Sequence, residues 1–363
     1  MTVETAVPVA YLNRIATAVP PHDVHAAFVS FADRLLRDRR EHVLFRRMAD
    51  RSQIAHRWSC LAPAVPDAPG ADEAIDTTGF YRFGSFPSTA DRMRRFEADA
   101  PDLVTRAVER LDLGPSPPTH LIIVSCTGLS APGLDFTLID RFGLDPSIER
   151  TVIGFMGCYA AINGLKLARH IVWAEPKARV LLVCIELCTL HLQESTDLEQ
   201  VLTFLIFGDG CAAALISAEP SGFALDGFQA IRVAGTAGQI TWQIRDRGFD
   251  MTLSGRVPGS IADGLRSASG RLLPDGPEAI DLWAVHPGGR SVLDAVEAAL
   301  GLPASALATS RDILRSYGNM SSATVLFVLE AMLREDPGGR RGCAMAFGPG
   351  LVAETMRFSS ARH

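Results

Sequence analysis

Three residues suited to nucleophilic, covalent chemistry stand far apart in the chain: Cys158, His286 and Asn319. Cys158 comes where an apolar, strand-like run passes through two glycines into a predicted helix, so the thiol is expected in the first helical turn. There the positive end of the helix dipole would lower its pKa and favour the thiolate. An imidazole can hold a thiolate as an ion pair, and His and Asn together can donate hydrogen bonds to an oxyanion.

Each residue also has a structural interpretation when taken alone. Most free cysteines are small buried apolar residues. His286 could cap the end of a strand, and Asn319 could adopt a left-handed turn before a helix. The elements around the three residues decide between these interpretations.

A weak internal repeat places the three residues at equivalent points. The strand His120–Val124 ends before Cys126, and the strand Ile280–Val285 ends before His286. Cys158 follows Cys126 by 32 residues and opens a predicted helix; Asn319 follows His286 by 33 and does the same. A further strand ends 28 residues later in each copy.

The repeat predicts two βαβ-rich halves, an N-terminal half over 1–220 that carries Cys158 and a C-terminal half over 221–363 that carries His286 and Asn319. Ligands of α/β sheets bind beyond the carboxyl ends of the strands. We therefore expect the thiol, the imidazole and the carboxamide to meet between the halves.

Composition bounds the class of protein. The 363 residues are 47 % hydrophobic and 21 % charged, which is typical of a globular protein with a large core. A formal net charge of -6 argues against a general nucleic-acid binder. No apolar run approaches the length of a spanning helix, and the first 21 residues do not resemble a secretory signal. We expect a cytoplasmic protein that binds neither membrane nor nucleic acid.

The seven cysteines are odd in number and scattered through apolar segments, which is typical of a reducing compartment. Cys184 and Cys188 lie in an apolar strand and its exit, and no second ligand pair has zinc spacing. We predict no metal site.

The N-terminal region is predicted to hold an extended segment, Val7–Ile15, and then a helical region, Val24–Met48. A Pro-rich loop at 63–79 precedes a helix from about Met93 to Leu111. A basic cluster at 46–57 is either a solvated helix face or a contact for ligand phosphates.

Five segments carry a resemblance to a known family: 154–158 (GFMGC), 205–210 (LIFGDG), 283–289 (WAVHPGG), 317–322 (YGNMSS) and 346–350 (AFGPG). Over nearly its whole length the chain resembles the type III polyketide synthases, the chalcone synthase family. The resemblance implies a thiolase-like α/β fold of two αβαβα halves, which form a five-layered core, and a homodimer. It also implies coenzyme A thioesters as substrates, with no other cofactor.

By this resemblance Cys158 holds the starter acyl group and the growing chain, while His286 and Asn319 promote decarboxylation of malonyl-CoA and stabilise the enolate. The expected activity is an iterative condensation followed by cyclisation to a pyrone, resorcinol or related phenolic. The resemblance assigns Phe207 as an aromatic gatekeeper; a core aromatic is the other interpretation.

The resemblance also assigns residues that hold the substrates. Arg47 and Arg51 match two basic positions that bind coenzyme A in the family. At a third position, commonly lysine in the family, this chain has Leu44, and Arg46 could supply the charge instead. Gly288 and Gly289 would lie along the pantetheine arm. The remaining pocket candidates are Cys126, Thr127, Ala131, Cys188, His191, Trp242, Met251 and Ser321.

Several pocket positions depart from the plant enzymes of the family. Cys126 and Thr127 replace a Thr-Ser pair, which puts a second thiol near the cavity. Trp242 stands where glycine is frequent and would narrow one end, and Met251 is more pliable than an aromatic residue. Ala131 matches a loop that reaches into the partner subunit's cavity. These changes argue against a coumaroyl starter.

Two other functions remain open from the sequence. A ketoacyl-ACP synthase III-like enzyme, which condenses once, would use the same Cys, His and Asn. A catalytically inactive thiolase-fold scaffold would need none of them.

Overall fold

The fold is described from a computed structural model, which describes residues 8–361 except 37 and 66–72. Within these residues, nine strands form one hydrogen-bonded sheet in the order β11-β12-β13-β8-β1-β7-β6-β4-β5. The halves join at β1 and β8, where Tyr11 pairs with Ala224 and Leu12 with Phe223.

Among its described residues, the first half contains five strands of this sheet and six α-helices. Its strands are β1 (Tyr11–Ala18), β4 (His120–Ser125), β5 (Glu149–Gly154), β6 (Val180–Leu187) and β7 (Asp209–Ser217), with the short strands β2 (His22–Asp23) and β3 (Trp58–Ser59) beside them. Its helices are α1 (His25–Leu35), α2 (Arg39–Ser52), α3 (Thr89–Leu111), α4 (Leu134–Phe142), α5 (Ala160–Ala174) and α6 (Leu198–Phe204).

The second half contributes the other four strands, a separate hairpin and four helices. Its strands are β8 (Phe223–Arg232), β11 (Leu282–Val285), β12 (Arg341–Gly348) and β13 (Val352–Ser360), and the hairpin is β9 (Ile240–Arg245) with β10 (Gly248–Leu253). Its helices are α7 (Val257–Leu272), α8 (Arg290–Leu300), α9 (Ala308–Tyr317) and α10 (Thr324–Glu335).

The predicted repeat is present in the topology. In the first half β4 and β6 are parallel, and β6, β7 and β1 follow as antiparallel neighbours. In the second half β11 and β12 are parallel, and β12, β13 and β8 follow in the same way. α5 and α10 hold the equivalent places before β6 and β12.

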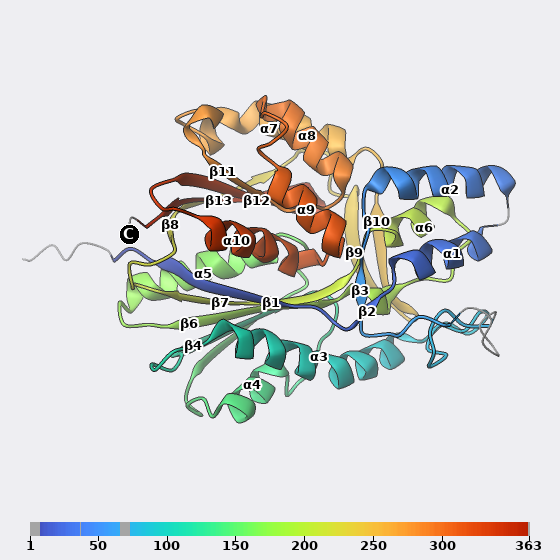
Figure 1. Cartoon of the computed structure of the whole chain (residues 1–363), viewed down its shortest axis with the longest axis horizontal. Helices are drawn as coiled ribbons and strands as arrows, with labels where there is room; N and C mark the ends of the chain where they lie inside the picture. The colour runs from blue at the N-terminus through green and yellow to red at the C-terminus, as the bar shows by residue number, and fades with distance from the viewer. Residues whose placement is uncertain (1–7, 37, 66–72, 362–363) are drawn as a thin grey trace, which may run out of the picture.

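The elements stack in five layers of helix, strand, helix, strand and helix, which is the thiolase-like arrangement. α5 and α10 lie in the middle, with β6 and β7 on one side and β12 and β13 on the other (Figure 1). α3 and α4 cover the outer face of the first half, and α7 and α8 cover the outer face of the second.

Strand periodicity explains this layering. Along β6, Leu181 and Val183 point into the core beneath α3, whereas Leu182 and Cys184 point toward the central helices. β12 divides in the same way, so β6 and β12 are buried on both faces, as their unbroken apolar sequences require.

Two local expectations need correction. The helical region Val24–Met48 is two helices, because Leu36 is extended and the Asp38 side chain accepts a hydrogen bond from the Arg40 N–H to start α2. The extended segment begins as a strand at Tyr11 rather than Val7, which lies outside the described residues. Part of the 63–79 loop also lies outside them, and Thr89–Leu111 is helical as predicted.

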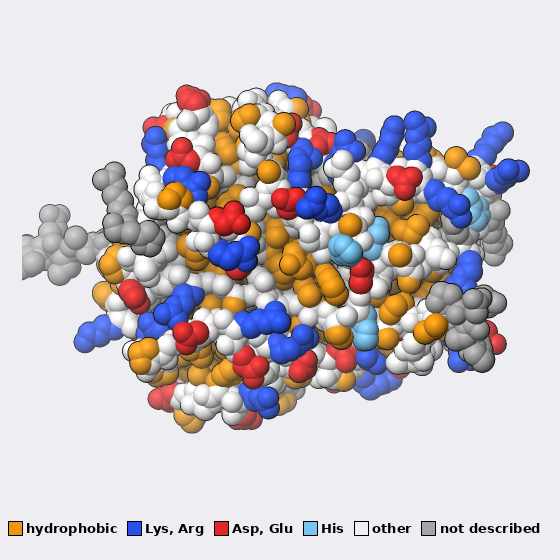
Figure 2. Space-filling view, viewed as in Figure 1, with side chains coloured by type: hydrophobic (Ala, Val, Ile, Leu, Met, Phe, Trp, Pro, Cys, Tyr) orange, Lys and Arg blue, Asp and Glu red, His pale blue; other side chains and the backbone are white. Residues whose placement is uncertain are grey.

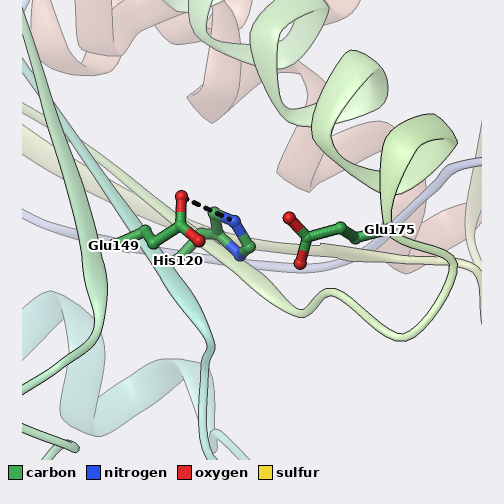
Figure 3. A group of neighbouring side chains, drawn as sticks. All are labelled: His120, Glu149 and Glu175. Carbon is green, nitrogen blue, oxygen red and sulfur yellow. Dashed lines mark ion pairs between the residues drawn. The ribbon is translucent and has the colours of Figure 1, made fainter.

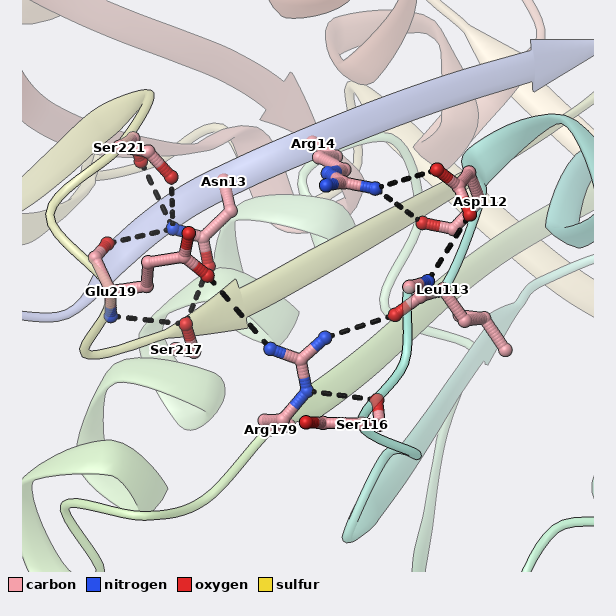
Figure 4. Close-up of polar contacts among 10 residues, drawn as sticks. Asn13, Arg14, Asp112, Leu113, Ser116, Arg179, Ser217, Glu219 and Ser221 are labelled. Atoms are coloured by element: carbon pink, nitrogen blue, oxygen red, sulfur yellow. Dashed lines mark hydrogen bonds and ion pairs between the residues drawn. The ribbon is translucent and has the colours of Figure 1, made fainter.

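Polar side chains fasten the end of the sheet at which β4 and β6 begin (Figure 4). The Asn13 amide donates to the Glu219 carbonyl at 2.8 Å and accepts from Ser217 Oγ at 2.7 Å. Arg179 Nη2 donates to the Leu113 carbonyl at 3.0 Å. These contacts lie at the end of the sheet where β1, β4 and β6 begin. The candidate catalytic residues lie at the opposite end of the strands.

Candidate active site

Cys158 lies between β5 and α5. It precedes Tyr159, the N-cap of α5, and the helix itself begins at Ala160, so the thiol stands just before the first turn rather than in it. Gly157 has a φ of 81°, and a Cβ there would lie 2.2 Å from Pro349 Cδ. Only glycine fits this approach, which sets the direction in which Cys158 enters the site.

His286 and Asn319 come from the second half. The His286 N–H extends the β11–β12 pairing by donating to the Met345 carbonyl at 2.7 Å. Asn319 is held by backbone pairing with the Phe207 segment: its N–H donates to the Ile206 carbonyl at 2.8 Å, and its carbonyl accepts from the Gly208 N–H at 3.0 Å. The position of Asn319 is therefore coupled to that of Phe207.

These side chains line one buried chamber. Cys158, His286, Asn319 and Phe207 border the same cavity, and Met251 and Gly288 complete part of its wall. Cys158 Sγ lies 3.7 Å from Ser321 Oγ, to which the thiol donates. Ser321 has a φ of 47°, a strained conformation for a residue with a side chain, and its N–H donates to Asn319 Oδ1 at 2.8 Å.

The ionisation state of Cys158 differs from the expectation. Burial raises the pKa of the thiol to about 11, and the Ser321 and Asn319 side chains offset only part of that rise. The sequence-based prediction of a lowered pKa is therefore wrong for the ligand-free protein, because desolvation of the thiolate outweighs the stabilisation available just before a helix.

His286 is neutral for the same reason. Burial lowers the pKa of its imidazole to about 3, and neither ring nitrogen has a hydrogen-bond partner among the described residues. The expected thiolate–imidazolium pair is thus not the resting state. A neutral imidazole with two unused nitrogens can accept a proton at one and donate its own at the other.

A buried carboxyl under the chamber escaped the sequence analysis. Glu186 Oε2 accepts from the Cys126 N–H at 2.9 Å and from Thr127 Oγ1 at 2.8 Å, and Ser322 Oγ donates to Oε1. Burial raises the pKa of this carboxyl to about 7. The available signal was a single acidic residue inside the apolar run 180–187.

The pocket candidates fall into two groups. Beside the cavity of His286 and Asn319 lies another that shares Cys158, Phe207 and Met251 with it, and we describe the two together as the chamber. Six of the candidates border this second part: Cys126, Thr127, Cys188, Trp242, Met251 and Ser321. His191 lies behind this wall, where its ring stacks on Phe249 at 4.2 Å between centroids and its Nε2 is 2.7 Å from the Thr127 carbonyl. Trp242 Nε1 donates to the Cys126 carbonyl at 2.8 Å, so the indole is fixed in the wall.

The other candidates lie on the surface or at the chamber mouth. Arg47 and Arg51 are exposed on α2, a helix that carries several arginines, in a region where basic side chains gather (Figure 2). Gly288 borders the chamber and Gly289 precedes α8. Ala131 is exposed and lies in the loop between β4 and α4.

One grouping among the described residues has metal-ligand chemistry. His120, Glu149 and Glu175 place one ligand atom each within 4.8 Å of the others (Figure 3). His120 Nε2 is 3.5 Å from Glu149 Oε2, and its Nδ1 is 2.9 Å from Thr119 Oγ1. The group stands where β4 begins, at the opposite end of that strand from Cys126, and takes no part in the chamber. None of the described helices has the length and apolarity to cross a bilayer.

Comparison with protein families gives two matches that together cover most of the chain. The pattern described as "Chalcone and stilbene synthases, N-terminal domain" matches residues 5–220, and the corresponding C-terminal domain matches residues 227–361.

A curated relative is the alpha-pyrone synthesis polyketide synthase-like protein of Mycobacterium tuberculosis, which is 33 % identical over 375 aligned positions that cover 98 % of this chain and 92 % of the relative.

Solved structures of similar proteins agree in fold. Tetrahydroxynaphthalene synthase of Streptomyces coelicolor, described as a bacterial type III polyketide synthase, has a TM-score of 0.83 at 27 % identity and covers 97 % of this chain and all of its own. The C-terminal type III polyketide synthase domain of a hybrid enzyme from Dictyostelium has a TM-score of 0.86 at 26 % identity, with 97 % and 99 % covered.

Proposed function

Because the chain belongs to the chalcone and stilbene synthase family and is a type III polyketide synthase, we propose that it condenses malonyl-CoA iteratively onto an acyl starter held on Cys158. The observation that carries the proposal is the shared chamber of Cys158, His286 and Asn319. The first half, 1–220, supplies the nucleophile, and the second, 221–363, supplies the imidazole and the amide.

Loading begins with transfer of the thiol proton. Neutral His286 accepts the proton from Cys158 Sγ, and the sulfur attacks the thioester carbonyl of the acyl-CoA. The bond between that carbonyl carbon and the coenzyme A sulfur breaks, and the departing sulfur takes the proton back from His286. The acyl group is then a thioester on Cys158, and His286 is neutral again.

Extension needs donors aimed at a developing oxyanion. When malonyl-CoA loses carbon dioxide, the electrons of the broken C–C bond form an enolate on the thioester oxygen. The N–H of neutral His286 and Asn319 Nδ2 donate to that oxygen in a buried site, where fixed dipoles stabilise the transition state most. The enolate carbon attacks the acyl carbonyl on Cys158, and the cysteine sulfur leaves as a thiolate when the new C–C bond forms. For the next cycle this thiolate takes the extended chain back from its coenzyme A thioester, and the released coenzyme A sulfur takes a proton from solvent.

The product class follows from the relatives and from the pocket. The relative from Mycobacterium is named for alpha-pyrone synthesis. A pyrone forms when an enol oxygen of the chain attacks the thioester carbonyl and releases the chain as a ring. The chamber wall of Trp242, Met251 and three thiols is largely apolar, which favours aliphatic starters, and we propose a pyrone as the product.

Coenzyme A would approach across α2 and α8. Arg47 and Arg51 offer exposed cations for the phosphates, and Gly288 and Gly289 give the pantetheine arm a wall without side chains. No metal or further cofactor enters these steps.

A second copy of the chain completes the assembly in this proposal. β5 is the end strand of the sheet, and five of its six residues are exposed. Exposed apolar side chains surround it, namely Leu129, Phe136, Val152 and Met156. An uncovered edge of this kind invites pairing, so we propose a homodimer in which two β5 edges meet and Ala131 approaches the partner's cavity.

The test is a product profile with malonyl-CoA and a series of aliphatic acyl-CoA starters. We expect chains extended more than once and released as pyrones. A product extended a single time, and only on a carrier protein, would instead identify a ketoacyl-ACP synthase III-like enzyme. No turnover with any starter, together with no acylation of Cys158, would identify an inactive scaffold.

A further inference from the structure

A second, largely apolar cavity adjoins the chamber. Its empty space is about 550 Å³, part of which is open to solvent. Phe204, Phe207 and Cys188 border both this space and the Cys158 chamber. We call it the Arg57 cavity, after the charged residue in its wall; its apolar lining includes Val24, Ala27, Phe28, Leu61 and Leu192.

Four of the polar side chains that border the Arg57 cavity are bonded to protein groups. Ser59 Oγ and Thr189 Oγ1 bond to each other at 2.7 Å. The Asp76 carboxylate accepts from the N–H groups of Thr78, Phe80 and Tyr81. Tyr81 Oη donates to the Thr189 carbonyl at 2.7 Å. Because these four side chains already bond to protein groups, they offer few free polar atoms to a ligand in the cavity.

Arg57 is the exception. Its side chain is 2 % exposed, and Nη2 has no hydrogen-bond partner among the described residues. Nη1 donates to the carbonyls of Phe204 and Phe207 at 3.0 and 2.7 Å, and Nε donates to His25 Nδ1 at 3.0 Å.

None of the side-chain hydrogen-bond partners of Arg57 is charged, although the nearby carboxylates of Asp23 and Asp209 favour the guanidinium through space. Two are carbonyl groups, and the third, His25, is neutral at pH 7 because burial lowers its pKa to about 4. Burial lowers the pKa of Arg57 to about 9, so the side chain is still a cation at pH 7. Asp23 and Asp209 balance part of this charge, but neither accepts from Nη2, and a buried donor without an acceptor is unfavourable.

We propose that the Arg57 cavity receives the far end of an acyl starter that ends in a carboxylate, and that Arg57 Nη2 binds this carboxylate. The inference rests on the proposed function and names its substrate class: the half-thioester of an aliphatic dicarboxylic acid. The methylene chain passes Phe207 and packs on the apolar lining, and its terminal oxygen accepts from Nη2.

Loading of this starter breaks and forms the same bonds as any other. The carbonyl carbon transfers from the coenzyme A sulfur to Cys158 Sγ, and the distal carboxylate is unchanged. Arg57 therefore determines which starter is bound and takes no part in the bond changes. Arg57 also donates to the Phe204 and Phe207 carbonyls, so a carboxylate bound at Nη2 is linked through the guanidinium to the two residues that separate the cavities.

The experiment compares acylation of Cys158 by paired coenzyme A thioesters of six, eight and ten carbons. Each pair consists of the monocarboxylic ester and the dicarboxylic half-ester of equal length, and the readout is the mass of the acylated protein over time. At one length or more, we expect the carboxylate-ended ester to react about 10-fold faster in kcat/KM or better. Arg57→Met should bring that ratio close to one.

A second pair of variants covers the case in which Arg57→Met does not fold. Ala27→Phe fills the Arg57 cavity and should remove the preference, whereas Ala26→Phe places the same ring on the exposed side of α1 and should retain it. Faster reaction of the methyl-ended ester at every length would overturn the inference, as would an equal ratio in Ala27→Phe and Ala26→Phe.

The two proposals fail in different ways. If methyl-ended starters acylate Cys158 and are extended while carboxylate-ended ones are not, the polyketide synthase function stands and the inference about Arg57 falls. If none of the six esters acylates Cys158, both fall.

Discussion

The catalytic cysteine in our mechanism rests as a thiol, and this determines how the reaction must start. With a pKa of about 11 for Cys158 and of about 3 for His286, an ion pair between them is unfavourable before substrate enters. Deprotonation must therefore accompany attack on the thioester, with His286 as a transient base. The same neutral imidazole then supplies the N–H that the enolate needs.

The first prediction concerns alkylation of Cys158. At pH 7 a thiol of pKa about 11 has about 100-fold less thiolate than one of pKa 9, so iodoacetamide should react about 100-fold more slowly than with an ordinary thiol. Since the thiolate fraction rises with pH, the rate should increase about tenfold per pH unit up to pH 10. Peptide mass spectrometry gives the rate at Cys158; fast labelling that is flat above pH 7 would contradict the structure.

The second prediction separates the two half-reactions. Cys158→Ala removes the acyl carrier, so chain extension should fall by more than about 1,000-fold. Release of carbon dioxide from malonyl-CoA should continue, because His286 and Asn319 remain. Labelled malonyl-CoA measures both in one assay, and His286→Ala is the matched variant in which decarboxylation should be lost. Extension that survives in Cys158→Ala would rule out the proposed nucleophile.

At the residue scale, the sequence indicated which residues are candidates for catalysis better than it indicated how buried their side chains are. Cys158, His286 and Asn319 could be selected because their types and spacing suit one reaction. The pKa of Cys158 could not be predicted, because the sequence shows that a helix follows but not that the thiol is fully buried. Arg57 was assigned to a basic surface cluster, yet its side chain turns inward to the Phe204 and Phe207 carbonyls.

At the scale of elements, the chamber floor depends on Glu186 near the end of β6. This one carboxyl joins the end of β4, through Cys126 and Thr127, to the loop before α10, through Ser322. The two segments come from different halves of the chain. Glu186 therefore fixes the wall beside Cys158 relative to the loop that carries Asn319.

The third prediction concerns this contact and pH. Burial places the pKa of folded Glu186 at about 7, above its usual 4.5, so between these pH values the folded chain keeps a proton that the unfolded chain has lost. Stability from this group therefore falls as pH rises from 4.5 to 7. Glu186→Gln cannot titrate. Between pH 4.5 and pH 7 its free energy of unfolding should therefore rise by up to about 3 kcal/mol relative to that of the natural chain.

Denaturant unfolding from pH 4 to pH 8 measures the difference. Glu109→Gln, which removes a carboxylate from the exposed surface, is the control. A Glu186→Gln difference that is equal at pH 4 and pH 8 would show that Glu186 does not titrate in this range.

Helices and strands were predicted correctly where the apolar periodicity is strong. Their ends were misplaced where a single capping residue determines the boundary. The strands before Cys126 and His286 and the long helix up to Leu111 follow from their apolar patterns. The break between α1 and α2 depends on Asp38 as an N-cap, and the start of α5 depends on the tight approach of Gly157 to Pro349. Such contacts are not visible in a local pattern, because one partner is distant in the chain.

At the scale of the whole molecule, the exposed edge of β5 is the surface that we propose binds a second copy of the chain. The fourth prediction is that Val152→Lys, which places a charge in the middle of this edge, turns the proposed homodimer into a monomer. Light scattering after size exclusion gives the mass. Ile244→Lys, at another exposed apolar residue, is the control and should stay dimeric. A dimer in both variants would place the interface elsewhere.

The repeat made the architecture predictable from the sequence, since the spacings of 32 and 33 residues match although the side chains of the two segments differ. The five-layered order follows once both sheets are buried on two faces, because only central helices can cover the inner ones. The Arg57 cavity lay beyond prediction, because its walls come from α1, the loop before α3 and the Phe204–Phe207 segment, which no local pattern brings together.

The protonated thiols around the chamber have a practical consequence for the handling of the enzyme. Cys126, Cys158 and Cys188 all border it, and burial holds the pKa of each above its usual value. Peroxides oxidise thiolates far faster than thiols. The idle enzyme should therefore keep its activity in aerated buffer without added reductant, and oxidative inactivation should accelerate during turnover, when Cys158 gives up its proton.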